Sequence, residues 1–378
     1  MPYNGDTTDL EPLYVHDVGA ERAAEEPAHD TVTLMPNSSI QFLVNGIVRE
    51  VAGGISRRFF EDNGAVDSGE GPILYSVNLD SDGTFHHPVT QAIADSRHTY
   101  AIEGSVALDA FLDRWIPLPF MRLMDGDAGS ALLAEGPSNW VRAFITRADT
   151  GDESELSHRI VLAIDTTCCP KPRGRGTALA APSIEDAQDG GLFRFNDDEE
   201  DIAWFVTEAW VDDWVRDVFE ERANPQDADR AAPGIRQPSP LEYLGHYLTA
   251  LAVLKECRIV PDIRLKGLGR NQAEAEFVCV DLVLDVGNSR TCAVLSEIVR
   301  SAAPQSVRTS SVLPLRDIDQ PWRTYAALFS SRIEFSRASF GNESYSRWSG
   351  RTNAFFWPSL VRVGIEAQKL ATQNHTST

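Results

Sequence analysis

Short apolar runs separated by turn residues predict a β-rich α+β domain over residues 31–195. Residues 40–44 and 47–51 are two such runs, and they flank Asn45-Gly46. Asn and Gly tolerate the positive φ that a two-residue hairpin turn requires. We therefore expect a hairpin at Asn45-Gly46, and a second hairpin between residues 73 and 89 around a polar loop.

A short helix and two further strands are predicted next. Four apolar residues have the spacing of one helical face: Leu108, Phe111, Leu112 and Trp115. Residues 105–115 are therefore predicted to form a helix. Residues 140–146 and 159–166 are apolar runs on either side of a polar loop, so we expect two strands there.

Residues 196–222 and 239–256 are predicted to be helical. The first range has an acidic first turn, which a helix N-terminus favours, but its aromatic residues do not share one face. Either both sides of this helix are covered or the helix breaks midway. In the second range, Ser239, Pro240 and Glu242 predict an N-terminal cap. Three strands are expected after these helices, at residues 259–265, 277–284 and 291–298.

The net charge of −22 is concentrated in two segments. Residues 1–30 contain eight acids and one arginine, and residues 185–229 contain sixteen acids and three arginines. The first segment also has few apolar residues, so we expect a disordered acidic tail. Negative charge repels phosphate, which disfavours nucleic acid as a partner. The acidic segments are either simply solvated or form a docking surface for a basic protein partner.

The lack of long apolar runs and the arrangement of the cysteines indicate a cytoplasmic protein. No run approaches the roughly 18 apolar residues of a membrane span, and the N-terminus lacks the apolar core of a signal peptide. The five cysteines form no CxxC pair and no Cys/His spacing typical of zinc. We expect a reducing compartment and no membrane span.

Candidate chemistry lies in a strand, turn and strand around Asp285. The apolar run that ends at Asp285 predicts a largely buried strand with an antiparallel partner at residues 291–298. Gly287 lets the backbone turn sharply, and the amides of such a turn form a concavity that binds anions. A carboxylate would repel bare phosphate, so Asp285 fits only beside Mg²⁺, through water. The alternative is a plain hairpin with a polar turn.

Two stretches resemble the actin-like ATPase superfamily, which includes actin, sugar kinases and DnaK-type chaperones. Residues 285–291, Asp-Val-Gly-Asn-Ser-Arg-Thr, are similar to its first phosphate motif. Residues 357–371 resemble the stretch of the chaperone branch in which a Pro-Ser strand precedes a Gly-x-Glu/Asp-Ala helix. The closer similarity is to the SrfB family of bacterial virulence factors, through residues 33–42, 282–291 and 329–371.

The resemblance implies an α+β fold in which a β-rich N-terminal domain precedes the first, incomplete part of an actin-like (ribonuclease H-like) ATPase domain. The expected division is a disordered tail (1–30), the β-rich domain (31–195), a helical acidic segment (196–256) and the partial ATPase domain (257–378). The residues after Asp285 are too few for a complete ATPase, so we expect a truncated N-terminal portion with an open sheet edge that associates.

The resemblance also implies a ligand, Mg-ATP. Asp285 would be the catalytic residue that orders Mg²⁺ and its waters. Four residues would cradle the β- and γ-phosphates: Gly287, Asn288, Ser289 and Thr291. The second phosphate loop and the adenosine-binding segment would lie beyond this chain, so we expect an ATP-binding virulence factor that is inactive alone. The alternative is a non-catalytic interaction or scaffold protein that keeps the fold and docks through its acidic surface.

Overall fold

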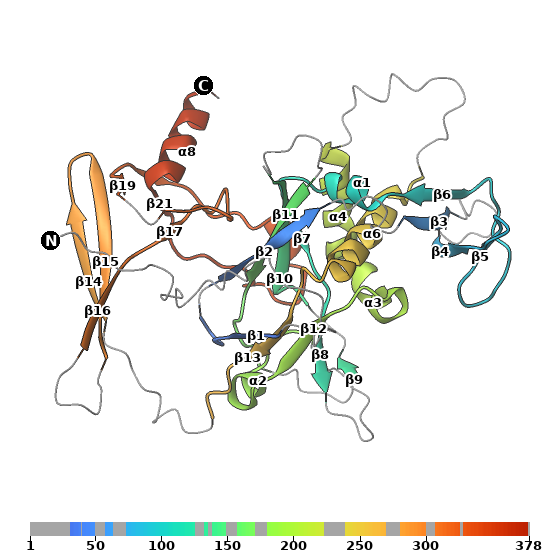
Figure 1. Ribbon diagram of the computed structural model, residues 1–378, viewed down its shortest axis with the longest axis horizontal. Coiled ribbons are helices and arrows are strands. Elements are labelled where there is room, and N and C mark those ends of the chain that lie inside the picture. Colours follow the sequence, from blue (N-terminus) through green and yellow to red (C-terminus); the bar gives the residue numbers. More distant parts are fainter. Residues whose placement is uncertain are drawn as a thin grey trace.

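The computed structural model is a mixed α+β protein with several small sheets, which confirms the predicted class (Figure 1). The described residues are 31–38, 40–49, 57–62, 73–124, 132–134, 138–148, 157–170, 180–222, 239–269, 280–299, 307–325 and 328–376. The predicted acidic tail, residues 1–30, lies outside them.

The largest sheet joins strands from distant parts of the chain. Its order is β1 (Thr31–Leu34), β13 (Asp262–Leu265), β12 (Leu192–Phe195), β8 (Phe120–Met124) and β9 (Leu132–Ala134). β1 and β13 are parallel, and the other neighbours are antiparallel. Because β1 pairs with β13, the part of the chain between these two strands packs together as one unit.

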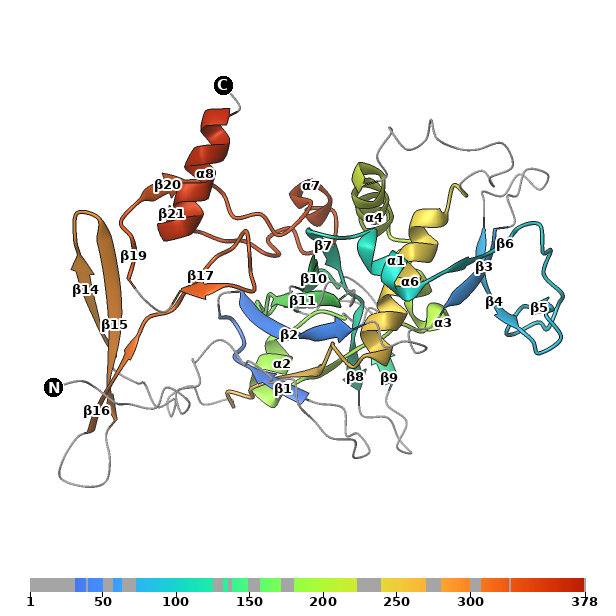
Figure 2. The same cartoon turned by 45° about the horizontal axis from the view of Figure 1, so that its top comes forward.

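A second sheet has the order β10 (Val141–Arg147), β11 (Ser157–Ile164) and β2 (Gln41–Arg49). The two strands predicted at residues 140–146 and 159–166 are thus confirmed as β10 and β11, which are buried along almost their whole length. Figure 2 shows this sheet in the middle of the molecule.

The hairpin predicted at Asn45-Gly46 is wrong. Both residues lie inside β2, which runs without a turn along β11. Ile160 pairs with Asn45 and Arg159 pairs with Ile47, so Gly46 is one extra residue in the ladder. Asn-Gly here accommodates a β-bulge, because the long partner strand β11 holds both flanking runs in line.

A third sheet has the order β5 (Phe85–His86), β4 (Leu74–Leu79), β3 (Arg58–Asp62) and β6 (Thr99–Ile102). The antiparallel pair β4–β5 confirms the second predicted hairpin, although its second strand is short. Both views place this sheet at one end of the molecule, opposite the hairpin of β14 and β15 described below (Figures 1 and 2).

Among the described residues, five helices lie between these strands: α1 (Gly104–Asp109), α2 (Ile184–Asp189), α3 (Glu199–Val206), α4 (Ala209–Arg222) and α6 (Glu242–Glu256). The long helix predicted over residues 196–222 is broken between α3 and α4, which confirms the second of the two possibilities. No helix among the described residues has the length and hydropathy that crossing a bilayer requires.

The helix predicted over residues 105–115 is too long. α1 ends at Asp109, and Trp115 belongs to strand β7 (Arg114–Pro117). The chain reverses at Asp113, which has φ 58° and donates its amide to the carbonyl of Ile145 on β10. The four apolar residues are buried as predicted. After Asp109, however, the chain pairs with the sheet instead of continuing as a helix.

The cap predicted at Ser239 is also wrong, because α6 begins at Glu242 and its N-cap is Leu241. The Ser239 hydroxyl accepts from the amide of Leu241 at 3.1 Å and bonds to the carboxylate of Asp62 on β3. Ser239 thus fastens the start of the helix to a neighbouring strand.

The C-terminal third contains several short pairings. β14 (Val280–Val286), β15 (Arg290–Val299), β16 (Val307–Val312) and β19 (Phe329–Ser330) form one sheet. β17 (Leu315–Arg316) pairs with β18 (Thr324–Tyr325), and β20 (Ile333–Phe335) pairs with β21 (Val361–Val363). α7 (Glu343–Ser346) and α8 (Gly364–Thr376) complete it.

β14 is not the buried strand that its sequence predicts. All seven of its residues are exposed, including Leu282 at 53% and Val286 at 72%. β14 is an edge strand, since β15 is its only neighbour in the sheet among the described strands. An apolar run therefore predicts burial only if another layer covers it, and no described layer covers β14.

The main core extends from Val32 to Leu265 and also includes residues from the C-terminal third. Ile318, Ala338, Phe340 and Phe355 belong to the same buried cluster. Phe340 packs within 6.0 Å of the Phe42 ring and within 5.7 Å of the Trp115 ring, measured between centroids. The segment that follows β20 thus returns to the β10–β11–β2 region and completes its packing.

Candidate functional site

The structure forms the predicted strand, turn and strand around Asp285. β14 and β15 are antiparallel, with Asp285 opposite Cys292 and Val286 opposite Thr291. The strand ends one residue after Asp285, and the turn occupies residues 287–289. The predicted antiparallel hairpin is therefore confirmed, whereas its role in binding phosphate stays a prediction.

Gly287 closes this turn. Its amide donates to the carbonyl of Arg290 at 3.0 Å. A Cβ at position 287 would lie 2.6 Å from the same carbonyl oxygen, closer than real Cβ contacts allow. Because the oxygen belongs to the backbone and cannot swing away, only glycine fits here without a shift of the turn.

Ser331 holds the turn from the side, and sequence reasoning missed it. Its hydroxyl donates to the carbonyl of Gly287 at 2.8 Å and lies 2.8 Å from the hydroxyl of Thr291. Its amide donates to the carbonyl of Ser289 at 3.1 Å. Ser331 comes 40 residues after Thr291 and follows β19, so no local spacing in the sequence relates it to the turn.

The predicted phosphate-binding residues differ in their surroundings. Asn288 and Ser289 are exposed, and within the described part of the chain their side chains form no hydrogen bond. Thr291 is 8% exposed and its hydroxyl is engaged with Ser331. Asp285 is exposed, and its pairing with Cys292 places it on the opposite face of the hairpin from Thr291, since side chains alternate along a strand.

A cavity of about 620 Å³ adjoins the turn. Its lining includes Ser289 from the turn, Arg290 from the start of β15, Tyr325 from β18, Phe329 from β19 and Ile365 from α8. Hydroxyl and guanidinium groups suit a phosphate, and aromatic rings suit a base. The lining thus fits a nucleotide in chemical type, whereas Asp285, the carboxylate that would suit Mg²⁺, is not among the lining residues.

Three carboxylates meet at the first turn of α8: Glu366 of the helix, Asp317 and Asp319, each with an oxygen within 4.8 Å of the others. Lys369 Nζ lies 2.9 Å from Asp317 Oδ2, and Arg362 Nε lies 3.2 Å from Glu366 Oε1. Two protein cations thus already occupy positions beside these acids. Burial raises the pKa of Glu366 to about 7, and Asp319 and Asp317 add to the rise while Arg362 opposes it.

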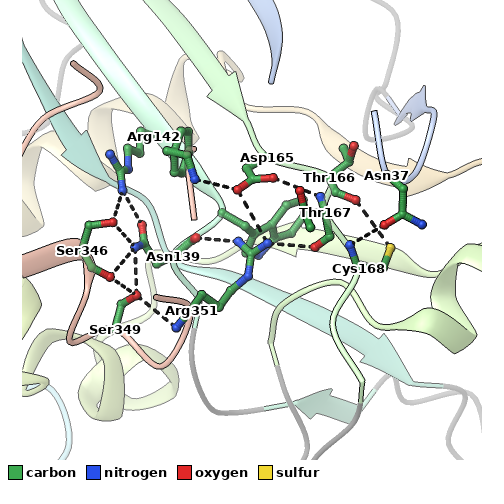
Figure 3. Close-up of polar contacts among 12 residues, drawn as sticks. Asn37, Asn139, Arg142, Asp165, Thr166, Thr167, Cys168, Ser346, Ser349 and Arg351 are labelled. Carbon is green, nitrogen blue, oxygen red and sulfur yellow. Dashed lines mark hydrogen bonds and ion pairs between the residues drawn. The ribbon is translucent and has the colours of Figure 1, made fainter. Parts of the chain in front are cut away.

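A buried polar cluster joins α7 and the loop after it to β10 and β11 (Figure 3). Arg142 donates to Asn139 Oδ1 at 2.9 Å and to Ser346 Oγ at 2.8 Å, and also bonds to the carbonyl of Phe340. Asn139 donates to the hydroxyl oxygens of Ser346 and Ser349, each at 2.9 Å. The cluster fixes α7 against the sheet.

Arg351 and Asp165 form the other half of the same cluster. Arg351 donates to the carbonyls of Asn139 at 2.6 Å and Thr167 at 2.8 Å, and its guanidinium lies 3.8 Å from Asp165. The Asp165 carboxylate also accepts from the amide of Phe355 at 2.7 Å. Figure 3 shows Arg351 between Asp165 and Ser349. Both charged side chains are at least 94% buried.

Many acids of residues 185–229 are engaged inside the fold. Asp186 pairs with buried Arg122 at 2.5 Å, and Glu199 pairs with Arg58 at 2.6 Å. Asp198 caps α3 by accepting from two backbone amides. Much of the negative charge of this segment therefore stabilises the fold.

Two further acids of this segment, Asp217 and Glu221, line a cavity of about 880 Å³. Its lining includes five acids and four aromatic residues: Asp113, Asp217, Glu221, Asp319, Glu343, Trp115, Phe144, Trp214 and Trp322. Arg114 also lines it and lies 3.3 Å from Glu221. A cavity of this composition attracts cations.

Comparison with known proteins gives one result. The family described as virulence factor SrfB matches residues 26–378. No curated protein and no solved structure matches the chain. The match includes the hairpin around Asp285, the polar cluster of Arg142 and Arg351, and both ends of the main core. Because it extends over most of the sequence, the chain belongs to the SrfB virulence-factor family.

Proposed function

We propose that this SrfB-family chain binds the phosphates of Mg-ATP at the turn between β14 and β15, as the N-terminal portion of an actin-like ATP-binding protein. Asn288 and Ser289 would contact the phosphates, Asp285 would order Mg²⁺ through water, and Gly287 and Thr291 would hold the turn in shape. The bound Mg²⁺ would supply charge neutralisation between phosphate oxygens.

The observation that carries this proposal is the way in which Ser331 braces the turn. Ser331 contacts Gly287, Ser289 and Thr291 through hydrogen bonds of 2.8–3.1 Å. The brace fixes the backbone and leaves the side chains of Asn288 and Ser289 exposed. A plain hairpin turn has no need of such a brace, whereas a phosphate site benefits from a fixed turn because binding then orders fewer groups.

The solvent exposure of this site determines how much ATPase activity we expect. Asp285 and the whole of β14 are exposed, so water reaches the site freely. Stabilisation of transferring phosphate depends on fixed charges in a site from which water is excluded. We therefore expect weak binding of Mg-ATP and little or no turnover by this chain.

Calorimetric titration with Mg-ATP tests the proposal. We expect weak but measurable binding, reduced about tenfold by Gly287→Ala and by Ser331→Ala. Asp285→Ala should remove the dependence on Mg²⁺. Asp281→Asn, four residues earlier on the same exposed strand, is the matched control and should leave affinity unchanged.

Two outcomes contradict the proposal. If wild-type protein shows no binding of Mg-ATP, or if Gly287→Ala and Asp281→Asn behave alike, the turn is structural only. Phosphate release should be measured in parallel. Rapid release that Asp285→Ala abolishes would show that the exposed site is catalytically competent and that the expected inactivity is wrong.

A second candidate function is that of an interaction protein, favoured by the acidic aromatic cavity of about 880 Å³. Asp217 and Glu221 of α4 and four aromatic side chains line it, a combination that suits the basic side chains of a protein partner. Tyr345 already donates to Asp217 at 2.7 Å and Arg114 lies 3.3 Å from Glu221, so a basic partner would compete with these contacts.

Titration with a short peptide rich in lysine and arginine tests this second candidate. The double variant Asp217→Asn/Glu221→Gln should weaken peptide binding about tenfold. Glu220→Gln is the control, since Glu220 is exposed on the same helix but does not line the cavity. Equal affinities for all three proteins would exclude the cavity as the docking site.

A further inference from the structure

We infer that the chain has a second ligand site, a cavity of about 440 Å³ beside α7 that takes a small anion joined to an aromatic or apolar body. The cavity is lined by Arg142, Arg337 and Arg347, together with side chains from residues 352–360. It is separate in residues from the turn at Asp285. Its volume lies within the range of roughly 300–1,000 Å³ of small-molecule sites.

Arg142 provides a buried positive charge at the floor of this cavity. It is 0% exposed, and the structure gives it no carboxylate partner within ion-pair distance among the described residues. Its hydrogen-bond acceptors are the uncharged Asn139, Ser346 and the Phe340 carbonyl, and its Nε has no hydrogen-bond partner there. A buried charge without a partner is costly, and an anion nearby would offset that cost.

The guanidinium of Arg142 lies at the buried floor of the cavity. Its central carbon is 3.7 Å from the centroid of the Phe355 ring, and Phe355, Phe340 and Ser346 are themselves lining residues. Arg142 is therefore placed to act through its electric field at short range, where the low dielectric of the interior preserves the interaction.

Arg337 and Arg347 provide the direct contacts at the rim. Both are exposed, and neither forms an ion pair with any residue that the structure describes. Glu343 is the single acid among the lining residues, so three arginines face one carboxylate. Exposed guanidinium groups converging on one cavity are typical of carboxylate and phosphate recognition.

The walls determine the rest of the ligand. Phe340 and Phe355 are buried in the floor, while Phe356 is 71% exposed and Trp357 is half-buried at the rim. Aromatic side chains of this kind stack on a planar ring or cover an apolar chain. Inorganic anions would use only the arginines, so the site favours an anion with an aromatic body.

The burial of Arg142 agrees with this assignment. Burial lowers the pKa of its guanidinium well below the usual value, Asp165 and Glu343 oppose this change, and nearby Arg351 adds to it. Loss of water, rather than an excess of positive charge, therefore makes the charged form of Arg142 costly. A bound anion would raise the pKa of Arg142 towards its normal range.

Calorimetric titration at pH 7 with phenyl phosphate, benzoate, inorganic phosphate and phenol tests the inference. We expect phenyl phosphate or benzoate to bind at least about tenfold more tightly than inorganic phosphate, and phenol not to bind. The tighter of the two aromatic anions identifies whether phosphate or carboxylate is preferred. Arg337→Ala and Arg347→Ala should each weaken binding about tenfold, and the double variant should abolish it.

Arg332→Ala is the matched control, because Arg332 is exposed on the same segment but pairs with Glu334 at 3.2 Å. If Arg332→Ala weakens binding as much as Arg337→Ala does, the loss of affinity reflects only the overall charge of the protein. That result would overturn the inference. Binding that disappears in Asp285→Ala or Gly287→Ala but persists without Arg337 and Arg347 would assign the anion to the β14–β15 turn. Absence of binding by both aromatic anions would also overturn it.

Discussion

Arg142 and Ser346 are joined by a buried 2.8 Å hydrogen bond across 204 residues of sequence. Arg142 lies on β10 in the central sheet, and Ser346 ends α7. Both side chains are at least 96% buried. The bond shows that the segment after β20 contributes to the interior of a region that begins at β1, across the boundary at residue 257 that the sequence predicts.

Asp165→Asn should destabilise the protein by about 2 kcal/mol or more, since it removes the buried negative charge beside Arg351 and weakens the acceptor for the Phe355 amide. Urea denaturation followed by tryptophan fluorescence measures the change. Asp95→Asn, which breaks an exposed pair with Arg97, is the control and should leave the midpoint nearly unchanged. Equal midpoints for the two variants would mean that the polar cluster contributes little.

Gly341→Ala should cost about 2 kcal/mol or more, because φ is 109° and a Cβ would overlap the Trp214 ring. Gly83→Ala isolates the backbone part of this effect. Gly83 has φ 84°, and a Cβ there would meet nothing within 4 Å, so a cost near 1 kcal/mol is expected. If both variants lose the same free energy of unfolding, the space beside Trp214 is not restrictive.

Glu366→Gln should stabilise the protein increasingly as the pH rises. The pKa of Glu366 is about 7 in the folded chain, against 4.5 as its ordinary value. A raised pKa means that the folded state loses stability as pH rises from about 4.5 through 7, when the unfolded chain releases this proton more easily. Denaturation curves at pH 5, 6, 7 and 8 should therefore diverge between the two proteins.

Glu334→Gln serves as the control for that series, because Glu334 forms a surface ion pair with Arg332. A constant difference between wild type and Glu366→Gln at every pH would contradict the placement of Glu366 among Asp317 and Asp319.

Val283→Lys should reduce self-association of the chain. Val283 is 56% exposed on β14, an edge strand with further exposed apolar side chains. Exposed apolar edges pair with other chains, and a lysine opposes such pairing. Sedimentation velocity at several concentrations should show oligomers of wild type and smaller species of the variant. Val89→Lys, at a 72% exposed position in the turn after β5, is the control.

Local sequence signals predicted elements whose partners are close along the chain. The hairpin at Asp285 and the pair β10–β11 are confirmed, because each joins neighbouring runs across a polar turn. The Asn45-Gly46 hairpin is wrong because β11, more than a hundred residues later, imposes one continuous strand. α1 is shorter than predicted because Asp113 pairs with Ile145.

The residues of the candidate site also include some that local sequence could identify and others that only the fold brings together. Asp285, Gly287 and Thr291 could be selected from their spacing, and the structure places them on one hairpin. Ser331 could not, because its relation to the turn depends on β19 joining β15. Local sequence signals could not identify the buried arginines either. Arg351 resembles any other arginine of a polar stretch until the fold brings it to Asp165.

The path of the chain from Ser331 to Phe340 has a mechanical consequence. Ser331 holds the turn at Gly287, and nine residues later Phe340 is wedged among Phe42, Trp115 and Phe355. A displacement of the turn therefore strains the short segment from Ser331 to Phe340, because Phe340 is packed in the interior. A fragment that stops before Phe340 would leave the turn without that anchor and would expose the rings that Phe340 covers. The hairpin and the core are thus expected to loosen together when this connection is cut.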